Sequence, residues 1–163
     1  MRLCAALAAS ALALCGMGAQ AARFTGVVSQ VIDGDTVWVR PDGGGPPRPV
    51  RIQGIDAPEI CQPFGRKARE ALAGQVRHRR VTVTTEGRDG HDRTLGTLHL
   101  QGRDVGEWMV SGGYAWSYRF KGDAGPYASQ EAAARRARKG LWRQRDAMPP
   151  RDFRVRHGSC RRG

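Results

Sequence analysis

Four acidic side chains stand in two short segments of an otherwise basic chain. Asp33 and Asp35 belong to an Asp-Gly-Asp-Thr turn, and Asp56 and Glu59 belong to an Asp-Ala-Pro-Glu turn further along. Each turn adjoins a predicted strand, so pairing of these strands would bring the carboxylates together. Clustered carboxylates repel one another, and a bound cation or a raised pKa relieves the repulsion. Because no His or Cys accompanies them, the oxygen ligands favour a hard ion, Ca²⁺ or Mg²⁺. Taken alone, Asp33-Gly34-Asp35 is better explained as an ordinary turn, and Ala57-Pro58-Glu59 could simply open a loop.

The charge of the whole chain points to a polyanionic partner. The formal net charge is +12 over 163 residues. Such an excess of basic over acidic residues favours binding to nucleic acid, because each phosphate contact releases condensed counterions. A preference for Arg over Lys can reflect base composition, but the excess of base over acid does not follow from it.

Residues 1–21 have the pattern of a signal peptide. Arg2 precedes an uncharged run rich in Ala and Leu, and Ala19-Gln20-Ala21 fits the small-x-small cleavage pattern. The apolar run is shorter than the roughly 18 residues expected of a spanning helix, although a retained anchor is the alternative. We therefore expect an exported protein, periplasmic or secreted, whose mature chain begins near Ala22.

The remaining chain reads as one domain, residues 22–148, followed by a basic tail, residues 149–163. Five segments rich in Val, Ile and Thr are predicted strands: 24–32, 36–40, 50–55, 81–85 and 94–100. Apolar residues at 64, 68, 72 and 76 predict an amphipathic helix. Two more helices are expected, one beginning after Asp104 with Glu107 in a capping box and one from Pro126 to about Lys139. The order favours an α+β fold, mainly β, with a five-stranded OB-type barrel and three helices. We expect the tail from Pro149 to be irregular.

Several motifs together resemble the staphylococcal nuclease family. They are, in chain order, Asp33-Gly34-Asp35-Thr36, Arg51, Gly54-Ile55-Asp56-Ala57-Pro58-Glu59, Asp89 with Arg93, Asp104-Val105, Gly113-Tyr114-Ala115 and Gly140-Leu141-Trp142. The resemblance covers nearly all of the mature chain. It implies an OB barrel with three helices and a Ca²⁺-dependent nuclease acting on DNA and RNA, with products ending in a 3′-phosphate.

The resemblance also implies roles for individual residues. Asp35 and Asp56 would be carboxylate ligands of Ca²⁺, with the backbone carbonyl of Ala57 as a further ligand. Glu59 would orient or deprotonate the attacking water. Arg51 and Arg93 would bind the phosphate, for which the planar guanidinium fork is well suited. Taken singly, either arginine is better explained as half of a surface ion pair.

A few positions depart from the family pattern, and one aromatic residue is a further candidate for substrate binding. His91-Asp92 precedes Arg93 where a Tyr-Gly pair is common, which adds a charge to that loop, and Gly106 stands where Asn is frequent. Tyr118 is a candidate for stacking on a base, whereas Tyr114 and Trp116 are expected in the core. A non-catalytic OB module that binds nucleic acid is the rival interpretation. No heptad or apolar stripe suggests an oligomer, so a monomer is expected.

Two cysteines remain once the leader is removed. In an oxidising compartment Cys61 and Cys160 are expected to form a disulfide. Cys61 follows Glu59 by two residues, so the bond would attach the basic tail to the catalytic turn. Two free, buried thiols are the alternative.

Overall fold

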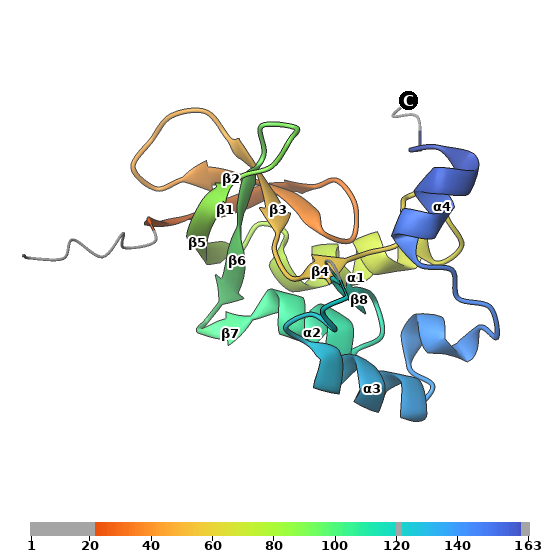
Figure 1. Ribbon diagram of the computed structural model, residues 1–163. Coiled ribbons are helices and arrows are strands. Elements are labelled where there is room, and N and C mark those ends of the chain that lie inside the picture. Colours follow the sequence, from red (N-terminus) through yellow and green to blue (C-terminus); the bar gives the residue numbers. More distant parts are fainter. Residues whose placement is uncertain (1–21, 120–121, 161–163) are drawn as a thin grey trace, which may run out of the picture.

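The computed structural model describes residues 22–119 and 122–160, so the predicted leader lies outside the described residues. Figure 1 shows a β-barrel on one side and helices on the other. The strands are β1 (Arg23–Val31), β2 (Thr36–Pro41), β3 (Arg48–Ile52), β4 (Ile55–Asp56), β5 (Arg80–Arg88), β6 (Thr94–Leu100), β7 (Arg103–Asp104) and β8 (Trp116–Ser117). The helices are α1 (Gly65–Val76), α2 (Val105–Ser111), α3 (Ala128–Arg136), the 3₁₀ turn η1 (Gly140–Arg143) and α4 (Pro150–His157).

Five strands close into the barrel that the sequence predicts. Antiparallel pairing runs from β3 to β2, β1, β5 and β6 in that order. The parallel pairing of β3 with β6, from Val50 opposite Thr94 to Ile52 opposite Gly96, joins the two ends of the sheet. The mainly β, α+β, OB-type fold is therefore confirmed.

The core lies inside the barrel and under α1. Inward positions alternate along the strands, so that Val37, Val39 and Val50 are fully buried. Ala68, Leu72 and Val76 are also fully buried, and they lie on one face of α1 as their four-residue spacing predicts. The barrel and α1 therefore share one core.

The second and third predicted helices are present with adjusted limits. The side chain of Asp104 caps α2 by accepting hydrogen bonds from the backbone N–H groups of Gly106 and Glu107. Helix α3 begins two residues after Pro126, since Tyr127 has non-helical backbone angles (φ −112°, ψ 29°) and its backbone N–H donates to Ser117 Oγ. Gly140, expected only to end this helix, also begins the turn η1.

The C-terminal segment contradicts the sequence prediction. Residues expected to be irregular form α4, so the described residues contain four α-helices instead of three. Pro150 stands in the first turn with Asp152, and Arg154, Arg156 and His157 occupy the last turn, where they complement the helix dipole. The residues that favour the start and the end of a helix are present in the sequence. The short segment has no apolar periodicity, however, and the prediction of an irregular tail was wrong for this reason.

Within the described residues, none of the helices has the length and apolar character needed to cross a membrane.

Candidate active site

The two acidic turns meet at one end of the barrel. The backbone N–H of Ala57, in the second turn, donates to Asp35 Oδ2 in the first turn at 2.9 Å. The turns approach so closely because Gly34 has no side chain: a Cβ there would lie 2.6 Å from the Cβ of Ala57 and 2.9 Å from that of Ala68. The convergence expected from the sequence is therefore present and depends on Gly34.

Asp56 is fixed by a strand pairing outside the barrel. It lies opposite Trp116 in the short pair formed by β4 and β8. Strand β8 is in turn held by Glu131 of α3, whose Oε2 accepts from the backbone N–H of Ser117 at 2.8 Å. Glu131 is 1% exposed, and its Oε1 pairs with Arg119 and Arg135. Sequence analysis missed this buried carboxylate, because Glu in an Ala-rich helix normally faces solvent.

Arg51 lies between the two predicted metal ligands. Its Nη2 is 3.1 Å from Asp35 Oδ2 and 3.5 Å from Asp56 Oδ1, and its Nη1 donates to the carbonyl of Ile52 at 2.7 Å. The Arg51 side chain is only 15% exposed, so this is not the solvated surface pair that a single arginine would suggest. One guanidinium is held between two carboxylates.

Arg93 reaches the same site from the loop between β5 and β6. Its Nε pairs with Asp89 Oδ2 at 2.7 Å, and its Nη1 donates to Thr36 Oγ1 at 3.2 Å. Thr36 Oγ1 donates in turn to Asp35 Oδ1 at 3.1 Å. Burial would raise the pKa of Asp89, but hydrogen bonds from the backbone N–H groups of His91 and Arg93 lower it. The hydroxyl of Thr36 thus links Arg93 to the acidic turns, a role that sequence analysis did not assign.

The carboxylate of Asp92, a departure from the family pattern, pairs with a residue other than Arg93. Asp92 pairs with Arg88 on the exposed side of the loop, at 2.6 Å between Oδ1 and Nη1. Asp92 adopts a positive φ of 58°, which is more accessible to Asp than to most residues. Arg93 is therefore delivered to Thr36 despite the changed loop sequence.

Glu59 is held by the segment that leads into α1. Its backbone N–H donates to Gln62 Oε1 at 3.1 Å, and the Gln62 side chain also donates to the carbonyl of Met148 at 2.6 Å. The Glu59 carbonyl passes so close to Gly65 that a Cβ on Gly65 would lie 1.8 Å from its oxygen. The start of α1 therefore fixes the backbone that carries Glu59.

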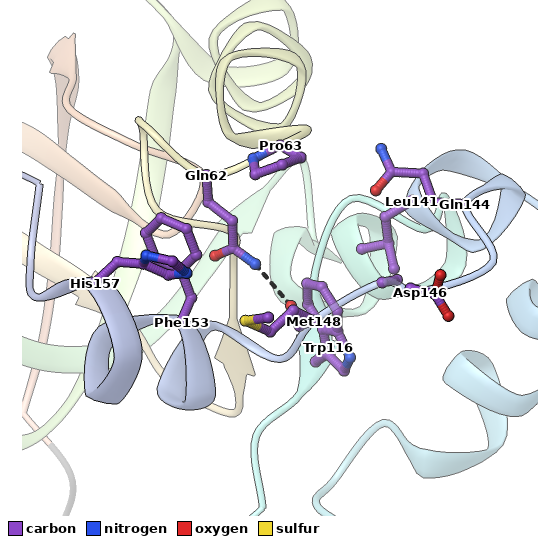
Figure 2. A pocket seen from close by; sticks show the side chains of 10 residues that line it. Gln62, Pro63, Trp116, Leu141, Gln144, Asp146, Met148, Phe153 and His157 are labelled. Carbon is purple, nitrogen blue, oxygen red and sulfur yellow. Dashed lines mark hydrogen bonds between the residues drawn. The ribbon is translucent and has the colours of Figure 1, made fainter.

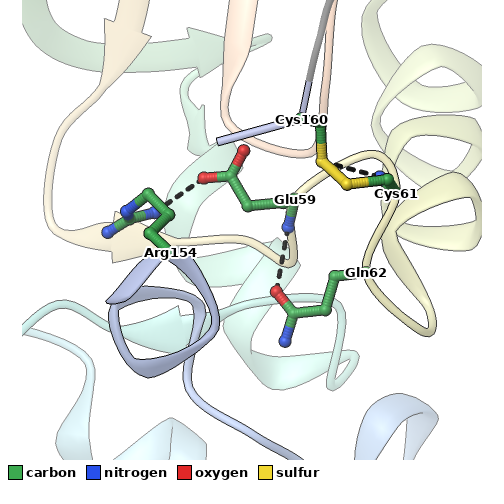
Figure 3. The surroundings of a disulfide bond; sticks show 5 residues. All are labelled: Glu59, Cys61, Gln62, Arg154 and Cys160. Atoms are coloured by element: carbon green, nitrogen blue, oxygen red, sulfur yellow. Dashed lines mark hydrogen bonds and ion pairs between the residues drawn. A yellow bond between two sulfur atoms is a disulfide. The ribbon is translucent and has the colours of Figure 1, made fainter. Parts of the chain in front are cut away.

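An arginine that sequence analysis missed completes the site. Arg154 of α4 places Nη1 2.8 Å from Glu59 Oε1, and its Nη1 and Nη2 each lie 3.4 Å from an oxygen of Asp56. Figure 3 shows Arg154 and the Cys61–Cys160 disulfide on either side of Glu59. The expected disulfide is present. The only sequence signal for Arg154 was that Cys160 would bring its neighbours to the Glu59 turn.

Two carboxyl groups of the acidic turns have raised pKa values. Burial and the neighbouring charge of Asp35 raise the pKa of Asp56 to about 6, although Arg154 and Arg51 oppose this. Burial and Asp35 likewise raise the pKa of Asp33 to about 7. Burial is the larger cause of both shifts and the charge of Asp35 adds to it, so a bound cation would stabilise the ionised carboxylates.

The donors at the site suit a hard cation. Among residues 22–119 and 122–160, no group of three or more His, Cys, Asp or Glu side chains is arranged to hold a metal ion. A cation between Asp35 and Asp56 would therefore need main-chain oxygen, such as the Ala57 carbonyl, and water as its other ligands. Ca²⁺ accepts that mixture, whereas metals that require His or Cys do not fit.

The aromatic residues divide as expected by exposure. Trp116 is 3% exposed, and Tyr114 is half-buried and stacks on Phe64 and Trp108. Tyr118 is 44% exposed, and its backbone N–H donates to the Gly54 carbonyl just before Asp56. It is thus accessible near the site.

Comparisons with known proteins agree with this arrangement. The family model described as "Staphylococcal nuclease homologue" matches residues 49–144. The chain is 42% identical over 155 residues to "Protein ParB" of Escherichia coli, covering 88% of this chain and 86% of that one. It is 38% identical over 141 residues to a "Micrococcal nuclease" of Shigella flexneri, covering 79% of each. An "Uncharacterized endonuclease" of Escherichia coli is 36% identical over 130 residues, covering 79% of this chain and 84% of that one. The chain therefore belongs to the staphylococcal nuclease family and is a nuclease that acts on nucleic acid.

Proposed function

We propose that the protein is an exported, monomeric, Ca²⁺-dependent nuclease that hydrolyses DNA and RNA and leaves 3′-phosphates. The observation that carries this proposal is the meeting of Asp35, Arg51 and Asp56 within 3.5 Å, with Glu59 linked to the same group through Arg154. Export rests on the leader-like residues 1–21 and agrees with a disulfide between Cys61 and Cys160.

Arg51 and Arg93 would offset the negative charge of the substrate. A phosphodiester is anionic and repels an incoming nucleophile unless its charge is balanced. Arg51 approaches the acidic turns from strand β3 and Arg93 from the loop between β5 and β6, so their guanidinium groups can bind different oxygens of one phosphate. Both groups are already held by carboxylate or hydroxyl partners, which reduces the cost of orienting them as charge develops.

Glu59 is the residue placed to handle the proton. Its carboxylate can accept a proton from a water molecule while that water's oxygen bonds to phosphorus. The bond from phosphorus to the 5′-oxygen then breaks, and the 5′-oxygen leaves as a hydroxyl after protonation by solvent. The phosphate stays on the 3′-oxygen.

Asp35, Asp56 and the Ala57 carbonyl would hold Ca²⁺. Once bound, the ion would neutralise phosphate charge and make the attacking water more acidic. The raised pKa of Asp56 is consistent with a carboxylate that gains from a cation.

The test is cleavage of a defined oligonucleotide by the chain starting at Ala22. We expect cleavage of single- and double-stranded DNA in Ca²⁺ and loss of cleavage in chelator, and Asp35→Asn should remove most activity in Ca²⁺. Full rate with Mg²⁺ alone, or without metal, would show that the metal assignment is wrong. Mass spectrometry of the fragments should find 3′-phosphates, and 5′-phosphates would contradict the proposed direction of cleavage.

A further inference from the structure

The guanidinium of Arg154 contacts the oxygens that the proposed function assigns to catalysis. It pairs with Glu59 at 2.8 Å and touches both carboxylate oxygens of Asp56 at 3.4 Å. Hydrogen bonding to Glu59 and the charge of Asp56 raise the pKa of Arg154, against the opposing effect of its burial. The contact therefore joins a full positive charge to two carboxylates.

Arg51 and Arg154 differ in how the fold carries them. Arg51 stands on a barrel strand and is 15% exposed, and its backbone is fixed by pairing on both sides. Arg154 is 35% exposed and stands on the eight-residue helix α4. It can withdraw without disturbing the barrel.

Among the residues that the structure describes, few contacts attach α4 to the other elements. The Cys61–Cys160 disulfide holds its C-terminal side, and the hydrogen bond from Gln62 to the Met148 carbonyl holds the preceding segment. Only Pro150 of the helix is buried, and Val155 is 81% exposed. Phe153 lines a pocket of about 170 Å³ together with Trp116 and Leu141. Figure 2 shows the side chains around this pocket. Covalent and ionic contacts, more than apolar packing, hold α4 in place.

One carboxylate oxygen cannot serve a calcium ion and a guanidinium fully at the same time. Asp56 lies beside Arg51, Arg154 and Asp35. Ca²⁺ has a higher charge density than a guanidinium group, so it would compete with the arginines for the lone pairs of the Asp56 oxygens. Arg51 is confined by its strand, whereas Arg154 has solvent beside it. Ca²⁺ would therefore displace Arg154, and not Arg51, from Asp56.

We propose that Arg154 is a further residue of the active site: an internal cation, held against Asp56 and Glu59 by the disulfide-anchored helix α4, that Ca²⁺ displaces. It thereby sets the calcium concentration at which the site fills. This inference rests on the proposed function, since it requires Ca²⁺ to bind at Asp35 and Asp56.

The direct test measures calcium binding by titration calorimetry without substrate. Arg154→Ala should lower the Kd for Ca²⁺ by about three- to tenfold, the scale of removing one competing charge at a partly exposed pair. Arg156→Ala removes the same charge from an exposed position of the same helix and should change Kd by less than about twofold. Arg154→Gln is the second variant should the alanine variant fold poorly.

The Cys61–Cys160 disulfide allows a second, independent test of the proposal. In a Cys61→Ser/Cys160→Ser background α4 no longer holds Arg154 in place, so Kd should fall and Arg154→Ala should add little further change. Such non-additivity is the mark of two changes acting on one contact.

The outcomes separate this inference from the proposed function. An unchanged or higher Kd in Arg154→Ala, while the wild-type chain binds Ca²⁺ and cuts DNA with it, would overturn this inference alone. Equal effects of Arg154→Ala and Arg156→Ala would also overturn it. No calcium binding by the wild-type chain would overturn both.

Discussion

The active site combines two regions that are built in different ways. Asp35, Arg51 and Asp56 are placed by strand pairing and by buried turns, and their neighbours Val50, Ile52 and Ile55 are almost completely buried. Arg154 is placed by a short helix that a disulfide and a few polar contacts attach to the barrel.

This difference separates the residues that carry out catalysis from Arg154, which sets the calcium concentration that catalysis requires. Moving the first set of residues requires breaking the barrel or the β4–β8 pair, so their geometry should persist whenever the protein is folded. Moving Arg154 requires only that α4 loosen. Substitutions in the barrel should therefore remove activity, whereas changes in α4 should alter the conditions under which activity appears.

Glu59 lies where the two regions meet and should show the largest catalytic effect. Glu59→Gln keeps the shape of the side chain but removes the proton acceptor, so kcat should fall by about 10²- to 10⁴-fold. Steady-state cleavage at saturating substrate and Ca²⁺ measures kcat, with Glu70→Gln on the exposed face of α1 as the control. Turnover close to wild type would remove Glu59 from the mechanism.

Substitutions of Arg51 and Arg93 should have the next largest effect on catalysis. Arg51→Lys and Arg93→Lys retain the charge but lose the planar fork, so each should lower kcat/KM by about 10²-fold, the loss typical of one transition-state donor. Arg66→Lys, at an exposed position of α1, is the matched control. A loss below about threefold in either site variant would mean that charge alone suffices there.

Removing the disulfide tests whether α4 is separable from the barrel. We expect reduction, or the Cys61→Ser/Cys160→Ser variant, to lower stability by about 1–2 kcal/mol, or roughly 3–8 °C in Tm. The expected effect is smaller than the ~4.7 kcal/mol of the chain-entropy model for a loop of about 100 residues, because the tail also gains freedom in the reduced folded state. Near-ultraviolet circular dichroism should show an intact core. Loss of the whole signal would mean that the two regions form one cooperative unit.

The smallest expected effect concerns the charge of Asp56. Its pKa is raised from 3.8 to about 6 in the folded protein. Between these values the folded state keeps a proton that the unfolded state releases, so this contribution to stability declines as pH rises through about 6. In chelator, Asp56→Asn should therefore have a higher Tm than wild type at pH 8, and the difference should vanish near pH 4.

Asp152→Asn, an exposed carboxylate of α4, is the control and should shift Tm by about 1 °C or less at either pH. A lower Tm for Asp56→Asn at pH 8 would mean that the pairing of Asp56 with its arginines outweighs burial and repulsion.

The barrel half of the site could be predicted because its signals are local and repeated. Alternating apolar residues indicate the strands, and the turn residues lie directly at strand ends. Pairing rules then bring Asp35 and Asp56 together. The four-residue spacing of Ala68, Leu72 and Val76 indicates α1 in the same way.

The other contributions depend on tertiary contacts that leave no pattern in the sequence. Arg154 is one of several arginines in a basic segment, and only the fold selects it. Glu131 stands in a segment that reads as an exposed helix, yet it is buried against β8. Its carboxylate has three partners: the backbone N–H of Ser117 in β8, Arg119, and Arg135 of its own helix. Thr36 is visible in the first acidic turn, but its link to Arg93 joins residues 57 positions apart.

The disulfide also closes the chain into a covalent ring from Cys61 to Cys160, two residues with a sequence separation of 99. Strands β5 and β6, helices α1 to α3 and the loop that delivers Arg93 all belong to this ring. A protease that cuts once within it, for example at the exposed residues 90–92, opens the ring but leaves one covalently connected molecule. Two cuts, or one cut followed by reduction, are needed before any piece can diffuse away.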